Sequence, residues 1–319
     1  MANGHKSGRK ILNNTQYYSN QLFDRAVDLR DCTNVIPTEK DLVIPIWKEK
    51  FIIDNNENLV LKIPIKLIRH KDNIYFLGKN KSINIYCYNL SEIEFKDIKN
   101  HIGNISLKRI RELISTLDHE TASLLAYAQG ITKWNKHQGF CSVCGAKTLV
   151  EQKGHSRKCS DNLCKQIFFP QISPAVIVLI EYITKNNKSL CLLQKSEIKN
   201  VTRCSTLAGF VEIGESLEDA VVREMKEEVD VDISSTRYIA SQPWIFSSAL
   251  MIGFVARAKT KKFKVDGKEI KDASWFSAEE IERLVEEKKL IISGKHSIAR
   301  FLIKSWVEKQ LNRQIICEV

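Results

Sequence analysis

Three glutamates in the middle of the chain have a spacing that suits metal-dependent chemistry. Glu224, Glu227 and Glu228 stand at positions i, i+3 and i+4, so on a helix they share one face. Carboxylates this close repel one another, which destabilises the helix unless cations lie between them. Oxygen ligands of this kind suit Mg²⁺ or Mn²⁺. Such ions can neutralise a diphosphate, position it and lower the pKa of an attacking water.

A solvated acidic helix face is the commoner explanation of such a cluster. Here it must also account for an upstream glutamate and two glycines at fixed offsets, Glu215, Gly209 and Gly214. Ser216 followed by Asp219 predicts the start of the helix. The buried stripe of this helix is expected to be Leu217, Ala220, Val221 and Met225. We also expect Arg223 to pair with Glu215 and so to fix the preceding loop to the helix.

Four of the nine cysteines have the spacing of metal ligands: Cys141, Cys144, Cys159 and Cys164. Two close thiolate pairs about a hairpin apart can converge into a tetrahedron, the geometry that zinc accepts from sulfur. With all four positions filled no place remains for water, so this zinc should be structural. The alternatives are four unrelated buried cysteines and competition from His155, which we expect to lie at the surface. An intracellular-looking chain also argues against a disulfide framework.

The elements that position these residues follow from hydrophobic patterns. Strands are predicted at 51–53, 59–65, 73–77 and 83–88, and helices around Leu107–Ile114 and Leu124–Ile131. This N-terminal part carries no recognisable chemistry. Beyond the cysteines, residues 175–181 and 189–194 predict paired strands, and a glycine-bounded loop leads into the acidic helix. Further strands and C-terminal helices should follow.

Length and composition limit the class of protein. The chain has 319 residues, of which 43% are hydrophobic and 27% charged, enough for two modest cores. No apolar stretch reaches membrane-spanning length, so we expect no membrane partner. The N-terminus has no apolar signal region and the C-terminus is not a peroxisomal tripeptide. A cytoplasmic location is the default, with a mitochondrial or peroxisomal one left open. The net charge of +11 favours polyanionic partners, although the lysines are scattered.

The acidic stretch resembles a known family motif. Six residues match the Nudix box, G-x5-E-x7-R-E-U-x-E-E-x-G-U: Gly209, Glu215, Arg223, Glu224, Glu227 and Glu228. One position departs, because Asp230 stands where the box has its second glycine. A glycine after a helix usually adopts a left-handed cap, and aspartate tolerates that conformation better than most residues. We therefore expect local strain at Asp230 and intact chemistry.

A four-cysteine site directly before a Nudix domain resembles the NADH pyrophosphatase branch of that family. The branch marker S-Q-P-W-P-F-P-x-S corresponds to Ser241 and the residues after it, which are predicted to bind substrate: Gln242, Pro243, Trp244, Ile245, Phe246, Ser247, Ser248 and Ala249. Two prolines and the final serine are replaced, by Ile245, Ser247 and Ala249. The rings of Trp244 and Phe246 suit stacking on a nicotinamide or adenine ring, although core aromatics on a strand are the plainer explanation. Losing two prolines makes the loop less pre-ordered.

The resemblance implies an α-β-α Nudix sandwich preceded by a zinc ribbon and a small α+β domain. We expect boundaries at 1–137, 138–170 and 171–319. Glu227 and Glu228 would be catalytic, and the catalytic metals, more than one per site, would bind Glu224, Glu228, Glu269 and the Ala208 carbonyl. Phe169 and Ala299 fall at substrate-contact positions. One structural Zn²⁺ and Mg²⁺ or Mn²⁺ are the implied cofactors, and a homodimer is the implied assembly.

By the same resemblance, water attacks one phosphorus of NADH, NAD or NADPH and releases two mononucleotides, NMNH and AMP from NADH. The reaction needs charge neutralisation more than covalent help, which agrees with the lack of a Ser/His or Cys/His nucleophile pattern. Removal of NAD caps from RNA is a close alternative that the sequence does not separate. A weakened nucleotide-binding protein is a third, motivated by Asp230, Ile245 and Ser247. The retained carboxylates favour activity.

Overall fold

The computed structural model describes residues 16, 18–19, 23–31, 37–54, 56, 58–68, 70–198 and 201–315. The chain forms two compact units. The N-terminal unit comprises Asn20–Ile172 and Ile245–Ser248. The C-terminal unit comprises Met1–Ser19, Ser173–Trp244 and Ala249–Val319. Within the described ranges, no helix has the length and apolarity that crossing a bilayer requires.

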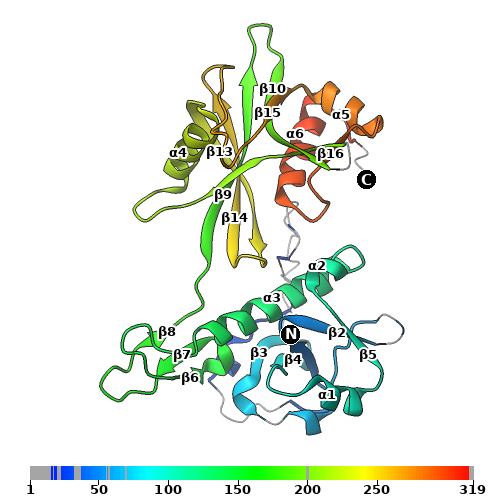
Figure 1. Ribbon diagram of the computed structural model, residues 1–319, viewed down its shortest axis with the longest axis vertical. Coiled ribbons are helices and arrows are strands. Elements are labelled where there is room, and N and C mark those ends of the chain that lie inside the picture. The colour runs from blue at the N-terminus through cyan, green and yellow to red at the C-terminus, as the bar shows by residue number, and fades with distance from the viewer. Residues whose placement is uncertain are drawn as a thin grey trace, which may run out of the picture. The chain divides into compact units, whose positions relative to one another are not determined.

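The N-terminal unit is built on a five-stranded sheet with the order β3-β4-β1-β2-β5 (Figure 1). Its strands are β1 (Leu42–Trp47), β2 (Lys50–Asp54), β3 (Ile74–Asn80), β4 (Ile83–Asn89) and β5 (Ile105–Lys108). Strands β1 and β4 run parallel, and the other neighbours are antiparallel. Its helices are α1 (Phe95–Ile102), α2 (Ile110–Leu113) and α3 (His119–His137). A core lies where the sheet packs on α1, around Phe76, Tyr86 and Ile98.

The strand predictions at 51–53, 73–77 and 83–88 are confirmed, as is the helix that carries Leu124 and Leu125. The strand prediction at 59–65 is wrong, because only Leu59 forms an isolated bridge there, to Ile53. The prediction of a helix from Leu107 to Ile114 is also wrong for its first residues. Leu107 lies in β5 and pairs with Ile52, so its apolar spacing reflects a strand edge followed by a one-turn helix.

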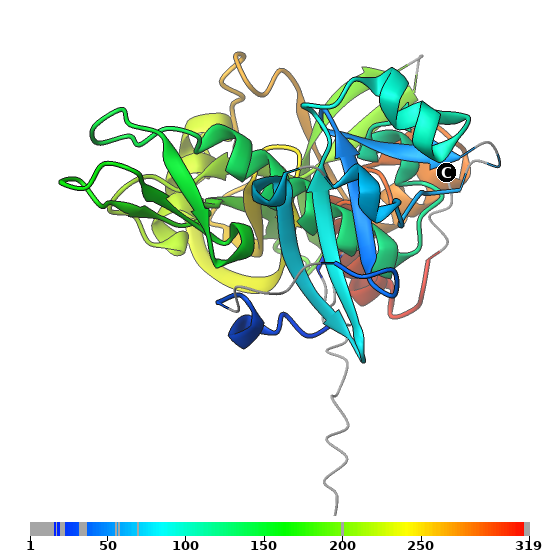
Figure 2. The ribbon, with the colours of Figure 1, turned by 90° about the horizontal axis from the view of Figure 1, so that it is seen from below.

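A small sheet of three antiparallel strands follows α3 and carries the cysteines (Figures 1 and 2). Its strands are β6 (Thr148–Glu151), β7 (Ser156–Cys159) and β8 (Ile167–Phe168). The expected surface position of His155 is wrong, because the residue is only 8% exposed. Its Nε2 lies 2.7 Å from the carbonyl oxygen of Phe76, and only an N–H can donate to that acceptor. Burial lowers the pKa of His155 to about 4, so the ring is neutral and anchors the small sheet to β3.

The C-terminal unit has an eight-stranded mixed sheet. Its main path runs β13-β14-β9-β10-β11-β16, with β12 paired to β9 and β15 to β10. The strands are β9 (Ser173–Ile183), β10 (Ser189–Ile198), β11 (Val201–Ser205), β12 (Leu207–Phe210), β13 (Ile233–Trp244), β14 (Ala249–Ala258), β15 (Ala273–Phe276) and β16 (Leu290–Ile292). The helices are α4 (Leu217–Val229), α5 (Ala278–Glu286) and α6 (Ile298–Leu311). The predicted pairing of β9 with β10 is confirmed.

Alternation along β9 gives this sheet two cores. Val176 and Val178 point to the face covered by α4, where they pack with Val221. Ile177 and Leu179 point to the face covered by α5 and α6. Figure 1 shows α4 on one side of the sheet and α5 and α6 on the other. The arrangement is an α-β-α sandwich, as predicted, and it holds α4 rigidly against β9 and β12.

Candidate functional site

Helix α4 begins where the sequence predicts. The Ser216 hydroxyl accepts from the Asp219 N–H at 3.1 Å, and the Asp219 carboxylate accepts from the Ser216 N–H at 3.2 Å. This capping box satisfies two backbone donors at the helix start. The helix ends at Asp230 in the left-handed conformation, φ 52° and ψ 40°. Lys226 Nζ lies 2.6 Å from the Asp230 carboxylate, so an ion pair accompanies the residue that replaces the box glycine.

Arg223 ties the loop before α4 to the helix. Its Nε lies 2.6 Å from Glu215 Oε1, which confirms the predicted pair, and its Nη2 donates to the Phe210 carbonyl at 2.8 Å. Its Nη1 contacts both Glu224 at 2.9 Å and Glu227 at 3.0 Å. Hydrogen bonds from Arg223, with one from a backbone N–H, lower the pKa of Glu215 to about 2. The loop carboxylate therefore stays ionised and holds the guanidinium beside the acidic face.

Gly209 is required because the Glu224 carboxylate occupies the space that a side chain would need. A Cβ placed on Gly209 would lie 1.8 Å from Glu224 Cδ and 2.0 Å from its Oε1. Gly209 lies in β12, which is paired with β9 and packs against α4. The box glycine and the box glutamate are thus complementary in shape: the strand backbone forms one wall of a carboxylate pocket.

We expect Gly209→Ala to lower turnover at this site about 100-fold, because the added methyl displaces the Glu224 carboxylate by an ångström or more. The fold should persist, since the displaced atoms are the end of a flexible side chain. Gly294→Ala is the matched control, because its Cβ meets no atom within 4 Å. Steady-state rates and thermal melts of both variants test this. Wild-type turnover in Gly209→Ala would show that the position of Glu224 is unimportant.

Glu228 lies in the interior of the C-terminal unit, and one of its carboxyl oxygens is buried without a hydrogen bond from any described residue. The residue is 5% exposed, and its Oε2 has no hydrogen-bond partner among the described residues. Burial first, and then the nearby charges of Glu224, Glu269 and Asp266, together raise the pKa of Glu228 to about 8. A buried carboxyl without a donor is costly, whereas a cation between these oxygens would satisfy it. The donor set, all oxygen, fits Mg²⁺ or Mn²⁺.

The predicted carboxylates share one region but do not converge on a point. In the described part of the chain, the cysteines are the only three or more candidate metal ligands whose atoms all lie within 4.8 Å. Glu269 is exposed and lines a hollow of about 390 Å³ together with Lys195 and Asp272. Asp266 was missed by the sequence argument. Its backbone N–H donates to the Glu228 carbonyl at 3.0 Å, and the Asp-Gly turn just before Glu269 was the available signal.

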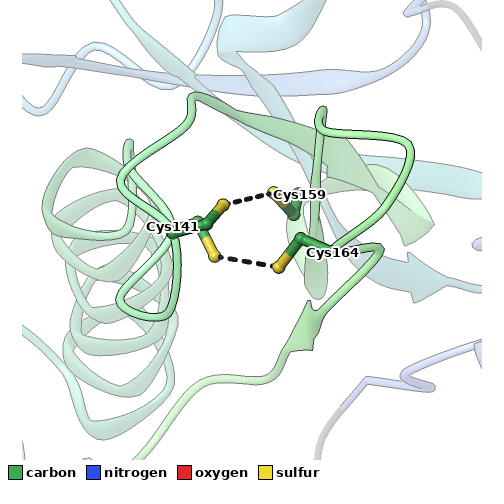
Figure 3. Close-up of side chains that lie close together, drawn as sticks. Cys141, Cys159 and Cys164 are labelled. Carbon is green, nitrogen blue, oxygen red and sulfur yellow. Dashed lines mark hydrogen bonds between the residues drawn. The ribbon is translucent and has the colours of Figure 1, made fainter.

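The four cysteines form a zinc-ligand set. Cys141 and Cys164 Sγ lie 3.7 Å apart, and Cys144 and Cys159 Sγ lie 3.4 Å apart. A tetrahedron with Zn–S bonds of about 2.3 Å has edges of about 3.8 Å, so the sulfurs are spaced as a bound zinc requires. Figure 3 shows the side chains of Cys141, Cys159 and Cys164 directed toward one another. All four are free of disulfides.

The residues of the predicted substrate marker lie in different surroundings. The Gln242 side chain is fully buried, where its Nε2 donates to the His296 carbonyl and its Oε1 accepts from the Ile298 N–H, both at 2.8 Å. This residue therefore holds the start of α6 to β13. Trp244 is half-buried, with its ring 6.3 Å from that of Tyr18.

The next four marker residues, 245–248, cluster with the N-terminal unit. Ile245 is buried there, and the Phe246 ring lies 4.2 Å from the Arg111 guanidinium. Ser247 and Ser248 are exposed. Pro243 and Ala249 are paired strand residues of β13 and β14. The stacking role of the two aromatic rings stays a prediction.

The other predicted contact residues are placed as follows. Ala208 is paired with Ile177 in the strand that also carries Gly209. Phe169 is 60% exposed, so its ring is free to meet a ligand. Ala299 is buried in the first turn of α6, and its N–H donates to the Ser297 hydroxyl at 3.1 Å. The ligand roles given to these three residues stay predictions.

Comparison with known proteins agrees with this geometry. Residues 173–300 match the model of the NUDIX domain, and residues 136–169 match that of the NADH pyrophosphatase zinc ribbon domain. The NAD-capped RNA hydrolase NudC of Pseudomonas aeruginosa is 35% identical over 201 residues, which cover 63% of this chain and 67% of that protein. The mouse NAD(P)H pyrophosphatase NUDT13, mitochondrial, is 35% identical over 217 residues, with 64% and 60% covered.

The human NAD-capped RNA hydrolase NUDT12 is 34% identical over 200 residues, which cover 60% of this chain. The chain spans less than half of that relative's length, 43%. The extent of the match to NudC, the two domain matches and the four clustered cysteines agree on one assignment. The chain belongs to the Nudix hydrolases, among those that carry an NADH pyrophosphatase zinc ribbon.

Proposed function

We propose that this protein hydrolyses the pyrophosphate bond of NADH, NAD and NADPH with the help of divalent metal. The observation that carries the proposal is the buried Glu228 carboxyl, whose Oε2 has no partner in the described part of the chain while other acids surround it. Burying such a group costs free energy, and a bound cation would remove that cost, so we infer that Glu228 is a cation ligand. The domain matches and the names of the relatives support the same chemistry.

We assign the metal ligands to Glu224, Glu228 and Glu269, with the Ala208 carbonyl as a further oxygen. Mg²⁺ or Mn²⁺ bound there would neutralise the diphosphate and lower the pKa of the attacking water. Arg223 keeps the Glu224 carboxylate in place at 2.9 Å and supplies a fixed positive charge beside it. The zinc in the four-cysteine site has no open position, so it takes no part in the reaction.

The reaction balances as a single displacement. A water oxygen forms a bond to one phosphorus, the bond from that phosphorus to the bridging oxygen breaks, and the bridging oxygen leaves with the other phosphate. Glu228 or Glu227 would accept the proton that the water loses. NADH then gives NMNH and AMP. The carboxylates and Arg223 need only position charges, which is the usual protein contribution to phosphoryl transfer.

A panel of substrates tests the proposal. The protein should hydrolyse NADH, NAD, NADPH, ADP-ribose, diadenosine polyphosphates or NAD-capped RNA when Mg²⁺ or Mn²⁺ is supplied, with the dinucleotides favoured. Chromatography of the products should give two mononucleotides from each dinucleotide. No turnover on any of these compounds with either metal would end the proposal.

Trp244 is proposed to stack on a base of the substrate, because its ring is half-buried and stands edge-on to the Tyr18 ring, 6.3 Å away. Base stacking on an aromatic ring contributes about 1–3 kcal/mol, so Trp244→Ala should raise KM for NADH about tenfold or more. The affinity for Mn²⁺ should not change. Trp244→Phe, which keeps a flat ring, should restore most of the affinity. An unchanged KM in Trp244→Ala would remove Trp244 from the base site.

Removal of NAD caps from RNA is the second candidate. Two of the relatives carry that activity in their names, and the chain has a net charge of +11. A weakened, nucleotide-binding protein is less well supported. Asp230 motivated that alternative, yet its left-handed cap and its ion pair with Lys226 accommodate it without disturbing α4.

A cytoplasmic homodimer is proposed for the assembly and its location. The NudC relative is bacterial, whereas NUDT13 is named as mitochondrial, so import into isolated mitochondria is the discriminating assay for location. Sedimentation at several concentrations tests the dimer.

A further inference from the structure

The segment between β14 and β15 is strongly basic. Residues 259–272, called the lysine loop below, contain six lysines and three acids, a net charge of +3 in fourteen residues. The lysines are Lys259, Lys261, Lys262, Lys264, Lys268 and Lys271, and all six are exposed. Ion pairs within the described part of the fold do not neutralise four of these charges. In the part of the chain that the structure describes, Lys259, Lys261, Lys262 and Lys264 form no ion pair within 4.0 Å.

The backbone of the lysine loop is nevertheless attached to the rest of the unit at several points. Phe263 and Val265 pack against the core on the α4 face of the sheet. The Lys261 carbonyl accepts from the Trp275 indole N–H at 2.9 Å, and the Lys264 N–H donates to the Val229 carbonyl at 2.9 Å. Because these contacts anchor the backbone that carries the exposed lysines, less backbone entropy is lost when the lysines meet a ligand.

The lysine loop also borders the proposed metal site. The Asp266 N–H donates to the carbonyl of Glu228 at 3.0 Å, and the Asp266 carboxylate accepts from the Glu269 and Ile270 N–H groups at 3.0 and 2.9 Å. Glu269, assigned above to the metal, is itself part of the loop. Four unpaired lysines therefore begin just beside the place where a diphosphate would lie.

A free dinucleotide does not need these charges. The negative charge of NADH or NAD lies on the diphosphate, which the metal site already neutralises, and NADPH adds one further phosphate. A dinucleotide at the 5′ end of an RNA adds one phosphate for every following nucleotide. Lysines read such a backbone as point charges, without regard to sequence, and they raise the rate of encounter at low salt.

We propose that the lysine loop is a docking surface for the phosphate backbone of an RNA chain whose 5′ end carries the dinucleotide. The proposal rests on the function proposed above and names the form of substrate that the site is built to receive. Four lysines spread over six residues, 259–264, match more than one phosphate of an extended strand.

The test is a variant with Lys259, Lys261, Lys262 and Lys264 all changed to Gln. The matched control changes four exposed lysines in other elements of the same unit, Lys185, Lys188, Lys288 and Lys309, so the net charge falls equally. Binding of a capped RNA without metal is measured against salt concentration. Each lost phosphate contact lowers the slope of log affinity against log salt by about 0.7, so the loop variant should lose about 2–3 and the control far less.

Turnover gives the second readout. With metal, the loop variant should lose about tenfold or more in kcat/KM on NAD-capped RNA at low salt and keep wild-type kcat/KM on NADH. Equal losses in loop and control variants, or an unchanged salt slope, would overturn the proposal, since general charge would then explain the binding. The proposal would also be overturned if the loop variant lost binding to phosphatidylserine vesicles but kept its binding to RNA. If neither substrate is hydrolysed by the wild type, the proposed function fails, while the metal-free slope still decides on the loop.

Discussion

Glu228→Gln is expected to lower hydrolysis of NADH about 1,000-fold while the protein stays folded. Glutamine has the same shape but one of its two terminal groups is an amide nitrogen, which repels a cation. The Oε2 of Glu228 has no hydrogen-bond partner among the residues that the structure describes, and other acids lie near it, as expected of a metal ligand. Steady-state kinetics with saturating Mg²⁺ and Mn²⁺ check the loss, and Glu218→Gln, an exposed glutamate of the same helix, is the control.

The same substitution has a signature in stability without metal. The pKa of Glu228 is about 8 in the folded protein, above the ordinary value of 4.5 that the unfolded chain takes. The folded state then binds this proton more tightly, so the stabilisation is complete below the unfolded pKa and is lost as the pH rises toward 8. Glu228→Gln lacks this loss and should gain on the wild type between pH 5 and pH 9 in thermal melts with chelator. A constant difference across that range would contradict the burial of an ionisable group.

Removal of zinc should be the most destructive change to the N-terminal unit. Structural zinc contributes roughly 10 kcal/mol or more to the folding free energy of small domains. A loss of half that free energy would lower the Tm of this unit by about 10–20 °C. The sulfurs lie 3.4 and 3.7 Å apart in pairs, so losing one ligand opens the whole cluster. Elemental analysis should find one zinc per chain in the wild type and none in Cys144→Ala.

The control for this experiment is Cys87→Ala, a buried cysteine of the same unit that contacts the Thr132 hydroxyl at 3.5 Å. Its variant should keep one zinc per chain and lose only the stability expected of a small core change. Absence of zinc from wild-type protein purified without chelator would refute the assignment, as would an unchanged Tm after zinc is removed.

Much of the C-terminal unit was predictable because its local signals agree. Ser216 and Asp219 fix the start of α4 by a hydrogen-bonding pattern that needs no distant partner. The αL cap at Asp230 and the pair between Arg223 and Glu215 are also local, within eight residues. The spacing of the four cysteines is a strong constraint for the same reason, since sulfur ligands must meet at bonding distance whatever surrounds them.

The errors occurred where distant contacts decide. His155 is buried and contacts the carbonyl of Phe76, which lies seventy-nine residues earlier in the chain. No local pattern reveals this contact. Leu107 follows helical spacing but lies in β5, the edge strand that pairs with β2. Here tertiary pairing overrides the local periodicity. The family marker likewise did not reveal that the side-chain nitrogen and oxygen of Gln242 both form hydrogen bonds with the backbone at the start of α6. The fit of Glu224 against Gly209 was visible only in three dimensions.

The central claim is that the carboxylates of Glu224 and Glu228 hold divalent metal. The most direct measurement is diffraction at the manganese absorption edge from crystals soaked in Mn²⁺, with and without a nonhydrolysable dinucleotide. We expect anomalous peaks about 2.1 Å from oxygens of both glutamates, and none at that place in Glu228→Gln. Peaks confined to other surfaces, with both carboxylates directed away from any bound ion, would contradict it.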